Sequence, residues 1–308
     1  VWRSNMSSLL YQITEKVLWI AGVKKIFAGE GDELYRKIEK MSKKRSFKIP
    51  SSISKHYDFE TIKIEDNPCF VIGKKGIKPQ KAVLYLFGGG YVLPPDAGDL
   101  KLAEKISEET DAQVWLPMYP LAPKHKLIDS VKMTAGVYKK MLEKFVPEKI
   151  SFVGFSSGAS LACTICVYIK EKGIKIPMPR RMILFSPGMQ IPPSEIQMEN
   201  MKKLSDKDPM IEPSFLKNIA PLLAEKKDEY LLSPVLYDWT GFPDIIIYYG
   251  THEVMSAFLP SVKKASEKAG INLIVHEGEG MMHCWPMLGF TKEGRKSREK
   301  LFKEIMSM

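Results

Sequence analysis

One serine stands in a pattern typical of a reactive hydroxyl. Ser156 is the centre of Gly154-Phe155-Ser156-Ser157-Gly158, a G-x-S-x-G motif. An apolar run precedes this motif and a helical pattern follows it, so the serine is predicted to lie on a sharp strand-to-helix turn. Such a turn leaves room only for glycine on either side, and it exposes the hydroxyl beside the free N–H groups of the helix start. We therefore expect Ser156 to act as a nucleophile.

Two other interpretations of this motif remain open at this point. The glycines could only permit a turn, with Ser156 as a helix cap. Ser157 also carries a hydroxyl, but it lacks the flanking glycine spacing. Its expected contribution is its backbone N–H.

A glycine triplet is the second candidate for chemistry. Gly88, Gly89 and Gly90 follow Phe87 at the end of a continuous apolar run that begins at Ala82. Glycine N–H groups are sterically unhindered and can stabilise a developing oxyanion. A glycine triplet alone also fits a flexible loop, so its place directly after a buried strand is what favours the oxyanion interpretation.

The rest of the chain alternates strand and helix patterns, which predicts a mostly parallel sheet covered by helices on both faces. Residues 188–240 interrupt this alternation and are interpreted as an insertion over the sheet edge. The predicted strands span 57–64, 69–72, 82–87, 113–116, 150–153, 182–185, 244–249 and 272–276. The predicted helices between and after them span 100–109, 128–145, 157–172, 257–269 and 291–306.

The N-terminal region precedes this alternation. Apolar residues recur there at helical spacing and predict an amphipathic helix over 6–28. A second helix is predicted over 32–41, and a connector over 46–54. The residues with this spacing are Leu9, Leu10, Ile13, Val17 and Ile20.

Several motifs, taken in order, resemble one family. The chain is similar to the hormone-sensitive-lipase-like family of α/β-hydrolases, which is marked by H-G-G-G and G-D-S-A-G. Besides the two glycine motifs, the matching segments are Tyr119–Pro123 (Y-x-L-A-P), Ser233–Pro243 (S-P…G-L-P) and Glu279–His283 (E-G-x-x-H). The resemblance implies an α/β-hydrolase fold with an eight-stranded sheet and a helical cap. It also implies ester hydrolysis without a metal or cofactor.

The resemblance implies the remaining catalytic residues. His283 occupies the position of the general base, in a loop after the last predicted strand, and the chain order of serine, acid and histidine is that of α/β-hydrolases. Glu253 is the expected acid, since Gly250–Met255 is similar to the family's G-S-D-E-V-L with His252 in place of the aspartate. Asp244 is the rival acid. The expected oxyanion donors are the N–H groups of Gly88, Gly89 and Ser157.

Two residues depart from the family pattern. Phe87 replaces the histidine of H-G-G-G, and Phe155 replaces the aspartate before the nucleophile. Backbone groups supply the oxyanion donors, so their role is expected to survive the first change. The second change puts the local geometry beside Ser156 in question.

Charge and cysteine content narrow the function further. The net charge of +10 comes from 46 basic and 36 acidic residues spread along the chain, with no arginine-rich or aromatic-interleaved nucleic-acid motif. We expect a solvated surface and no nucleic-acid partner. The four cysteines are too few for a disulfide framework, and a cytoplasmic location is expected. The apolar run Val17–Val23 is far below the ~18 residues of a membrane helix, so stable membrane insertion is not expected.

The sequence thus predicts a serine carboxylesterase acting on short- to medium-chain esters. Residues 1–54 are expected to form an N-terminal helical cap segment. The expected catalytic domain is 55–308, with a cap insertion at about 188–240. A homodimer is a further expectation. Three rival functions stay open: a catalytically silent small-ligand receptor, another acyl-transfer enzyme such as an amidase or transacylase, and a membrane-surface protein.

Overall fold

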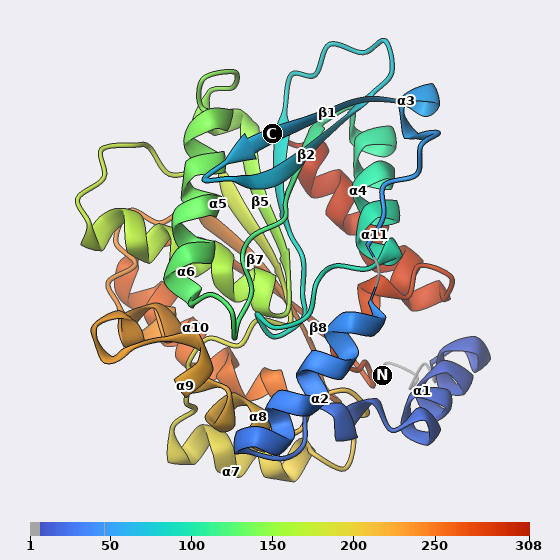
Figure 1. Cartoon of the computed structure of the whole chain (residues 1–308), viewed down its shortest axis with the longest axis vertical. Coiled ribbons are helices and arrows are strands. Elements are labelled where there is room, and N and C mark those ends of the chain that lie inside the picture. The colour runs from blue at the N-terminus through green and yellow to red at the C-terminus, as the bar shows by residue number, and fades with distance from the viewer. Residues whose placement is uncertain (1–6, 46) are drawn as a thin grey trace, which may run out of the picture.

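An eight-stranded sheet runs through the centre of the protein (Figure 1). The structure, a computed structural model, describes residues 7–45 and 47–308. The strand order is β1-β2-β4-β3-β5-β6-β7-β8, and all neighbours from β4 to β8 pair in parallel. The strands are β1 (Tyr57–Ile64), β2 (Asn67–Lys74), β3 (Ala82–Leu86), β4 (Gln113–Pro117), β5 (Ile150–Phe155), β6 (Arg181–Phe185), β7 (Asp244–Gly250) and β8 (Leu273–Gly278). This confirms the predicted mostly parallel, eight-stranded architecture.

The strand sequences explain this arrangement. Every residue of β3 and β5 is buried, as expected for central strands with helices on both faces. In β1, by contrast, most side chains are exposed or half-buried. That strand forms an antiparallel hairpin with β2 at the sheet edge, where one face meets water.

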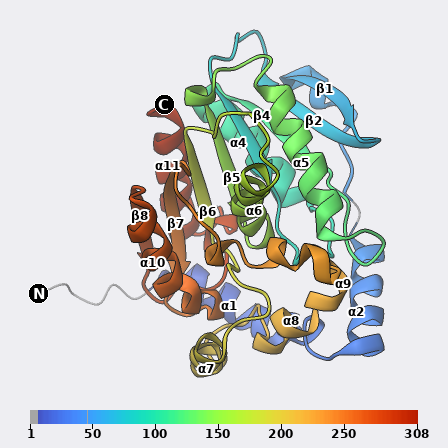
Figure 2. The same ribbon diagram turned by 90° about the vertical axis from the view of Figure 1, so that its left-hand side faces the viewer.

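Helices cover both faces of the sheet (Figures 1 and 2). On one side α4 packs against α11, and on the other α5 packs against α6. The helices that flank the sheet on its two faces are α4 (Ala97–Thr110), α5 (Leu127–Met141), α6 (Ser157–Glu171), α10 (Leu259–Ala269) and α11 (Lys292–Met306). The predicted helices at these positions are confirmed, with bounds that differ by a few residues.

A further group of helices lies at one end of the sheet, and two distant parts of the chain supply it (Figure 2). The N-terminal part supplies α1 (Leu9–Ala21), η1 (Val23–Ile26) and α2 (Gly31–Lys44), whereas α3 (Ile53–His56) lies beside β1 (Figure 1). The insertion supplies α7 (Glu195–Leu204), α8 (Pro213–Asn218), α9 (Ala220–Leu223), η3 (Lys226–Leu232) and η4 (Pro234–Leu236). The Phe27 and Phe215 rings pack edge to face at 4.8 Å and join the two parts.

The N-terminal helix is shorter than predicted. It ends at Ala21, because Gly22 adopts the left-handed conformation (φ 65°) and its N–H caps the last turn. The helical spacing of apolar residues alone predicts a helix that continues to residue 28. Residue 6 of the predicted helix, residues 1–6 of the predicted cap segment and Ser46 of the predicted connector lie outside the described residues.

Candidate active site

Ser156 lies on a strained turn between β5 and α6. Its φ is 52° and its ψ −122°, a conformation rare for a residue with a side chain. The chain passes so close to its neighbours here that only glycine fits. A Cβ on Gly158 would lie 2.1 Å from the carbonyl oxygen of Leu86, and one on Gly154 would lie 2.6 Å from the Cα of Ala159. These contacts explain the spacing of the motif physically.

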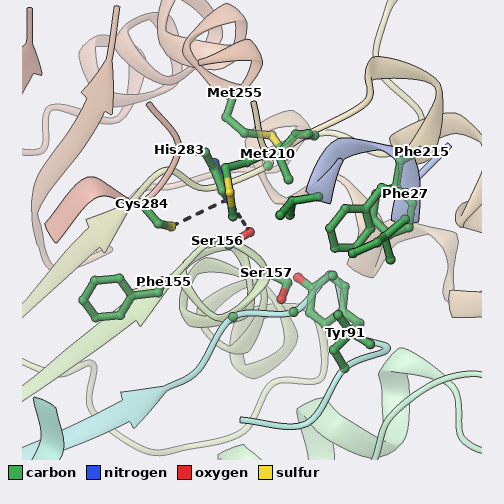
Figure 3. Close-up of a pocket in the computed structure, with 18 of the residues that line it drawn as sticks. Phe27, Tyr91, Phe155, Ser156, Ser157, Met210, Phe215, Met255, His283 and Cys284 are labelled. Atoms are coloured by element: carbon green, nitrogen blue, oxygen red, sulfur yellow. Dashed lines mark hydrogen bonds between the residues drawn. The ribbon is translucent and has the colours of Figure 1, made fainter. Parts of the chain in front are cut away.

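His283 meets the serine from the loop after β8. Its Nε2 lies 2.9 Å from the Ser156 Oγ, within hydrogen-bonding distance (Figure 3). The side chain is almost fully buried. Burial by itself lowers the pKa of His283, but the adjoining Cys284 and the Glu253 carboxylate raise it, and the net direction is upward.

Glu253 completes a hydrogen-bonded line of three side chains. It follows β7, is fully buried, and its Oε2 lies 2.8 Å from the Nδ1 of His283. Burial raises the pKa of Glu253, whereas the hydrogen bonds from His283 and the Gly250 N–H act against that rise. With the Nδ1 proton donated to this carboxylate, Nε2 is free to accept a proton from Ser156.

Ser186 orients the other oxygen of the carboxylate. The Oε1 of Glu253 accepts hydrogen bonds from the Gly250 N–H at 2.6 Å and from the Ser186 hydroxyl at 3.0 Å. The Ser186 oxygen in turn accepts a hydrogen bond from the N–H of Cys284 at 3.0 Å. One serine therefore links the acid to the histidine loop. No local sequence signal marked Ser186, because its partners lie far away along the chain.

The rival acid Asp244 lies elsewhere, and so do two further histidines of this part of the chain, His252 and His276. Asp244 begins β7, at the opposite end of that strand from Glu253, and pairs with Arg180 at 2.7 Å. His276 on β8 packs against the Tyr248 ring at 4.6 Å. The backbone N–H of His252 bonds to Met281, and this residue does not line the cavity beside Ser156.

The predicted oxyanion donors gather beside the nucleophile. Gly88 is so close that an added Cβ would lie 3.3 Å from the Cβ of Ser156. Gly89 has φ 128°, and a Cβ there would lie 2.5 Å from the carbonyl oxygen of Leu93. Ser157 begins α6, so its N–H has no acceptor within the helix. Gly88, Gly89 and Ser157 all line the cavity that opens beside Ser156.

The two phenylalanines that depart from the family pattern are part of the aromatic core. The Phe87 ring stacks on the Tyr119 ring at 4.1 Å, and the Tyr119 hydroxyl donates a hydrogen bond to the Phe87 carbonyl. Phe155 stacks on Phe185 at 4.5 Å and points away from Ser156 (Figure 3). Aromatic packing therefore holds both the glycine loop and the turn at the nucleophile.

A mostly apolar cavity of about 260 Å³ opens at the serine hydroxyl (Figure 3). The N-terminal part of the chain and the insertion both contribute to its wall. Residues that line it from these two parts include Leu18, Val23, Ile26, Phe27, Met210 and Phe215. Its apolar character suits a hydrocarbon group held beside a reactive polar centre.

Known proteins resemble this chain in sequence and in structure. The sequence model of a protein family, described as having the alpha/beta hydrolase fold, matches residues 83–287 of this chain. An acetyl-hydrolase of Streptomyces hygroscopicus is 25% identical over 228 residues, which cover 71% of this chain and 73% of the relative. Esterase LipU of Mycobacterium tuberculosis is 26% identical over 216 residues, covering 66% and 70%.

Two solved structures illustrate the shared fold. The esterase EstE5 superposes with a TM-score of 0.81 at 22% identity, covering 98% of this chain and 100% of that chain. An esterase from the bacterial hormone-sensitive lipase family gives 0.77 at 20% identity, covering 96% and 98%.

Proposed function

The chain belongs to the alpha/beta-hydrolase family, and from this premise we propose that it is a serine carboxylesterase acting on short- to medium-chain esters. The family match confirms the resemblance identified from the glycine and serine motifs. The observation that carries the proposal is the unbroken hydrogen-bonded line from Glu253 through His283 to Ser156. The esterase and acetyl-hydrolase relatives support the same reaction class.

In the first half of the reaction the serine acquires the acyl group. The Ser156 Oγ attacks the ester carbonyl carbon while its proton moves to the Nε2 of His283. The N–H groups of Gly88, Gly89 and Ser157 stabilise the resulting oxyanion. Collapse of this intermediate breaks the bond to the leaving alcohol, which takes the proton from His283.

In the second half water releases the acid. A water molecule gives a proton to His283 and attacks the acyl carbon. The tetrahedral intermediate expels the Ser156 oxygen, which recovers its proton from the imidazole. Throughout both halves Glu253 keeps the imidazole in one tautomer and stabilises its cation.

The cavity limits the acyl chain. Its volume of about 260 Å³ is below the roughly 300 Å³ at the small end of ligand pockets. We expect turnover of p-nitrophenyl esters to be highest for short chains and to fall steeply toward the longest ones. A profile from acetyl to dodecanoyl esters measures this directly.

Labelling with a fluorophosphonate tests the nucleophile. Wild-type protein is expected to bind the label and to hydrolyse p-nitrophenyl butyrate, and Ser156→Ala is expected to lose both. Ser157→Ala is the matched control, because only the backbone N–H of that residue takes part. Full labelling and turnover in Ser156→Ala would refute the proposal, and a wild-type chain that neither labels nor turns over esters would favour a silent receptor.

We further propose that residues 1–54 and about 188–240 form a cap over the catalytic domain, which spans 55–308. Both segments contribute side chains to the cavity wall, and the Nζ of Lys24 binds the Ser205 hydroxyl at 2.6 Å. A cytoplasmic location and a homodimer stay predictions. Cell fractionation and sedimentation velocity measure them.

A further inference from the structure

The outer face of α1 carries an apolar stripe that faces solvent. Among the described residues, five aliphatic side chains form it, and we call this set the α1 stripe. Its members and their exposed fractions are Leu9 (72%), Leu10 (47%), Ile13 (48%), Val17 (54%) and Ile20 (87%). At 100° per residue they cover about 100° of the helix circumference. Contiguous exposed apolar surface of this kind marks an interaction site.

The stripe is a fixed feature of the fold, because the opposite side of α1 is firmly attached. The N–H and hydroxyl of Ser8 donate to Glu293 on α11 at 2.6 and 2.7 Å. The buried Tyr11 hydroxyl accepts a hydrogen bond from the Met282 N–H. Leu18 on the inner side lines the cavity that opens at Ser156. The helix therefore cannot rotate its stripe inward without breaking these contacts.

Cationic and aromatic residues accompany the stripe. Lys16 on α1 and Lys25 on η1 are both exposed. Trp19 is partly exposed, and the Lys24 amine lies 5.6 Å above its ring. Apolar, tryptophan and lysine side chains, here spread over α1 and the adjoining η1, are the composition of helices that bind in the headgroup region of anionic membranes. The net charge of +10 adds a general attraction to such a surface.

We propose that the α1 stripe docks this protein on the surface of an anionic phospholipid bilayer. The helix is 13 residues long, roughly 20 Å, so it lies in the interface and does not cross the ~30 Å core. No helix in the described part of the chain is long and apolar enough to span a bilayer.

A second copy of the chain fits the stripe less well. Five aliphatic side chains offer on the order of a few hundred Å² of apolar surface. A specific dimer buries roughly 800 Å² on each partner. A bilayer needs no complementary shape, and it interacts favourably with the lysines that a symmetric dimer would bring together.

Docking has a consequence for the substrate, which rests on the proposed esterase function. The same segment that carries the stripe lines the cavity through Leu18, Val23 and Ile26. A docked molecule holds its cavity close to the lipid surface. Esters that partition into the membrane are therefore the substrates that benefit.

Vesicle co-sedimentation tests the docking directly. The full chain is mixed with vesicles of phosphatidylglycerol and phosphatidylcholine, or of phosphatidylcholine alone. The stripe variant is Ile13→Ser/Val17→Ser/Ile20→Ser. The matched control, Ile77→Ser/Val146→Ser/Leu236→Ser, removes exposed aliphatic side chains elsewhere on the surface.

We expect wild type and control to co-sediment with the anionic vesicles and bind less to the neutral ones. Partitioning of the stripe variant onto anionic vesicles is expected to fall about tenfold or more, because three aliphatic side chains that the bilayer would bury on docking are replaced by serine. All three proteins should hydrolyse soluble p-nitrophenyl butyrate equally, whereas the stripe variant alone should lose turnover of a butyrate ester of a long-chain alcohol dissolved in anionic vesicles. Lys16→Glu/Lys25→Glu, which leaves the apolar packing intact, should weaken anionic binding about tenfold or more.

Three results would overturn the proposal: no binding by wild type, equal binding by the stripe and wild-type proteins, or a wild-type dimer that the stripe variant converts to monomer. Ser156→Ala should bind vesicles like wild type. Vesicle binding and Ser156 labelling are thus separate measurements, and failure of docking leaves the esterase proposal standing.

Discussion

The phenol oxygen of Tyr11 accepts a hydrogen bond from the backbone N–H of Met282 at 2.6 Å. Tyr11 lies on α1, and Met282 immediately precedes His283 in the loop after β8. The N-terminal helix therefore holds the loop that carries the proposed general base. Burial raises the pKa of the Tyr11 phenol, so the hydroxyl stays protonated at physiological pH.

Removal of this hydroxyl should lower kcat more than it changes KM. Tyr11→Phe leaves the buried Met282 N–H without its acceptor, a cost of about 1–3 kcal/mol in the free energy of unfolding. A misplacement of about 1 Å costs about 100-fold in rate, so a partial shift of His283 is expected to lower kcat about tenfold. Steady-state kinetics measure this. Tyr35→Phe, on the exposed side of α2, is the matched control and should leave kcat unchanged.

Replacement of the acid should slow the reaction far more. Glu253→Gln keeps the shape of the side chain but loses the negative charge that fixes the His283 tautomer, so kcat is expected to fall about 10⁴-fold. The exposed Glu279, in the same loop as His283, offers the control Glu279→Gln, which should keep full activity. An equal loss in both variants would contradict the assignment of Glu253.

The pH dependence should report the raised pKa of His283. The imidazole must be neutral to accept the Ser156 proton, so kcat/KM should fall as pH drops through this pKa. Since the pKa is raised, the midpoint of the acid limb should lie above the usual value of about 6.5.

The neighbouring thiol offers a test of the cause. The Sγ of Cys284 lies 3.6 Å from the Nε2 of His283 and contributes to the rise in its pKa. Cys284→Ala should therefore move the acid limb to lower pH. Cys69→Ala, at a buried position on β2, should leave the limb where it is. A limb that stays unchanged in Cys284→Ala would contradict this cause.

The glycine loop should tolerate no side chain at its second position. Gly89→Ala places a Cβ against the Leu93 carbonyl, which displaces the expected oxyanion donors, so kcat is expected to fall about 10²- to 10³-fold. Gly76→Ala is the control, because Gly76 also has a positive φ but has open space around its Cα. Similar kcat values for the two variants would show that the loop does not form the oxyanion site.

Local patterns in the sequence predicted the parts of the fold and the site that depend on neighbouring residues. The glycines around Ser156 mark a tight turn, and the alternation of apolar strands with helices predicts the parallel sheet. Glu253 and His283 were identified through the resemblance to a family, since each stands in a short motif. The structure brings these side chains within 2.9 Å of their partners.

Contacts between distant residues could not be predicted in the same way. Ser186 and Tyr11 act through partners 67 and 271 residues away, and neither stands in a recognisable motif. Apolar spacing in the N-terminal region correctly predicted a helix. It could not tell which face packs, and the residues with that spacing form the exposed stripe, while Tyr11 and Leu18 face the protein.

Trapping of the acyl-enzyme tests the central claim most directly. The protein is mixed with p-nitrophenyl butyrate, quenched in acid within the first turnover, and analysed by intact mass and peptide mapping. We predict one butyryl group per chain, attached at Ser156, and none in Ser156→Ala. A butyryl group on another residue, or turnover with no covalent adduct at any quench time, would contradict the account.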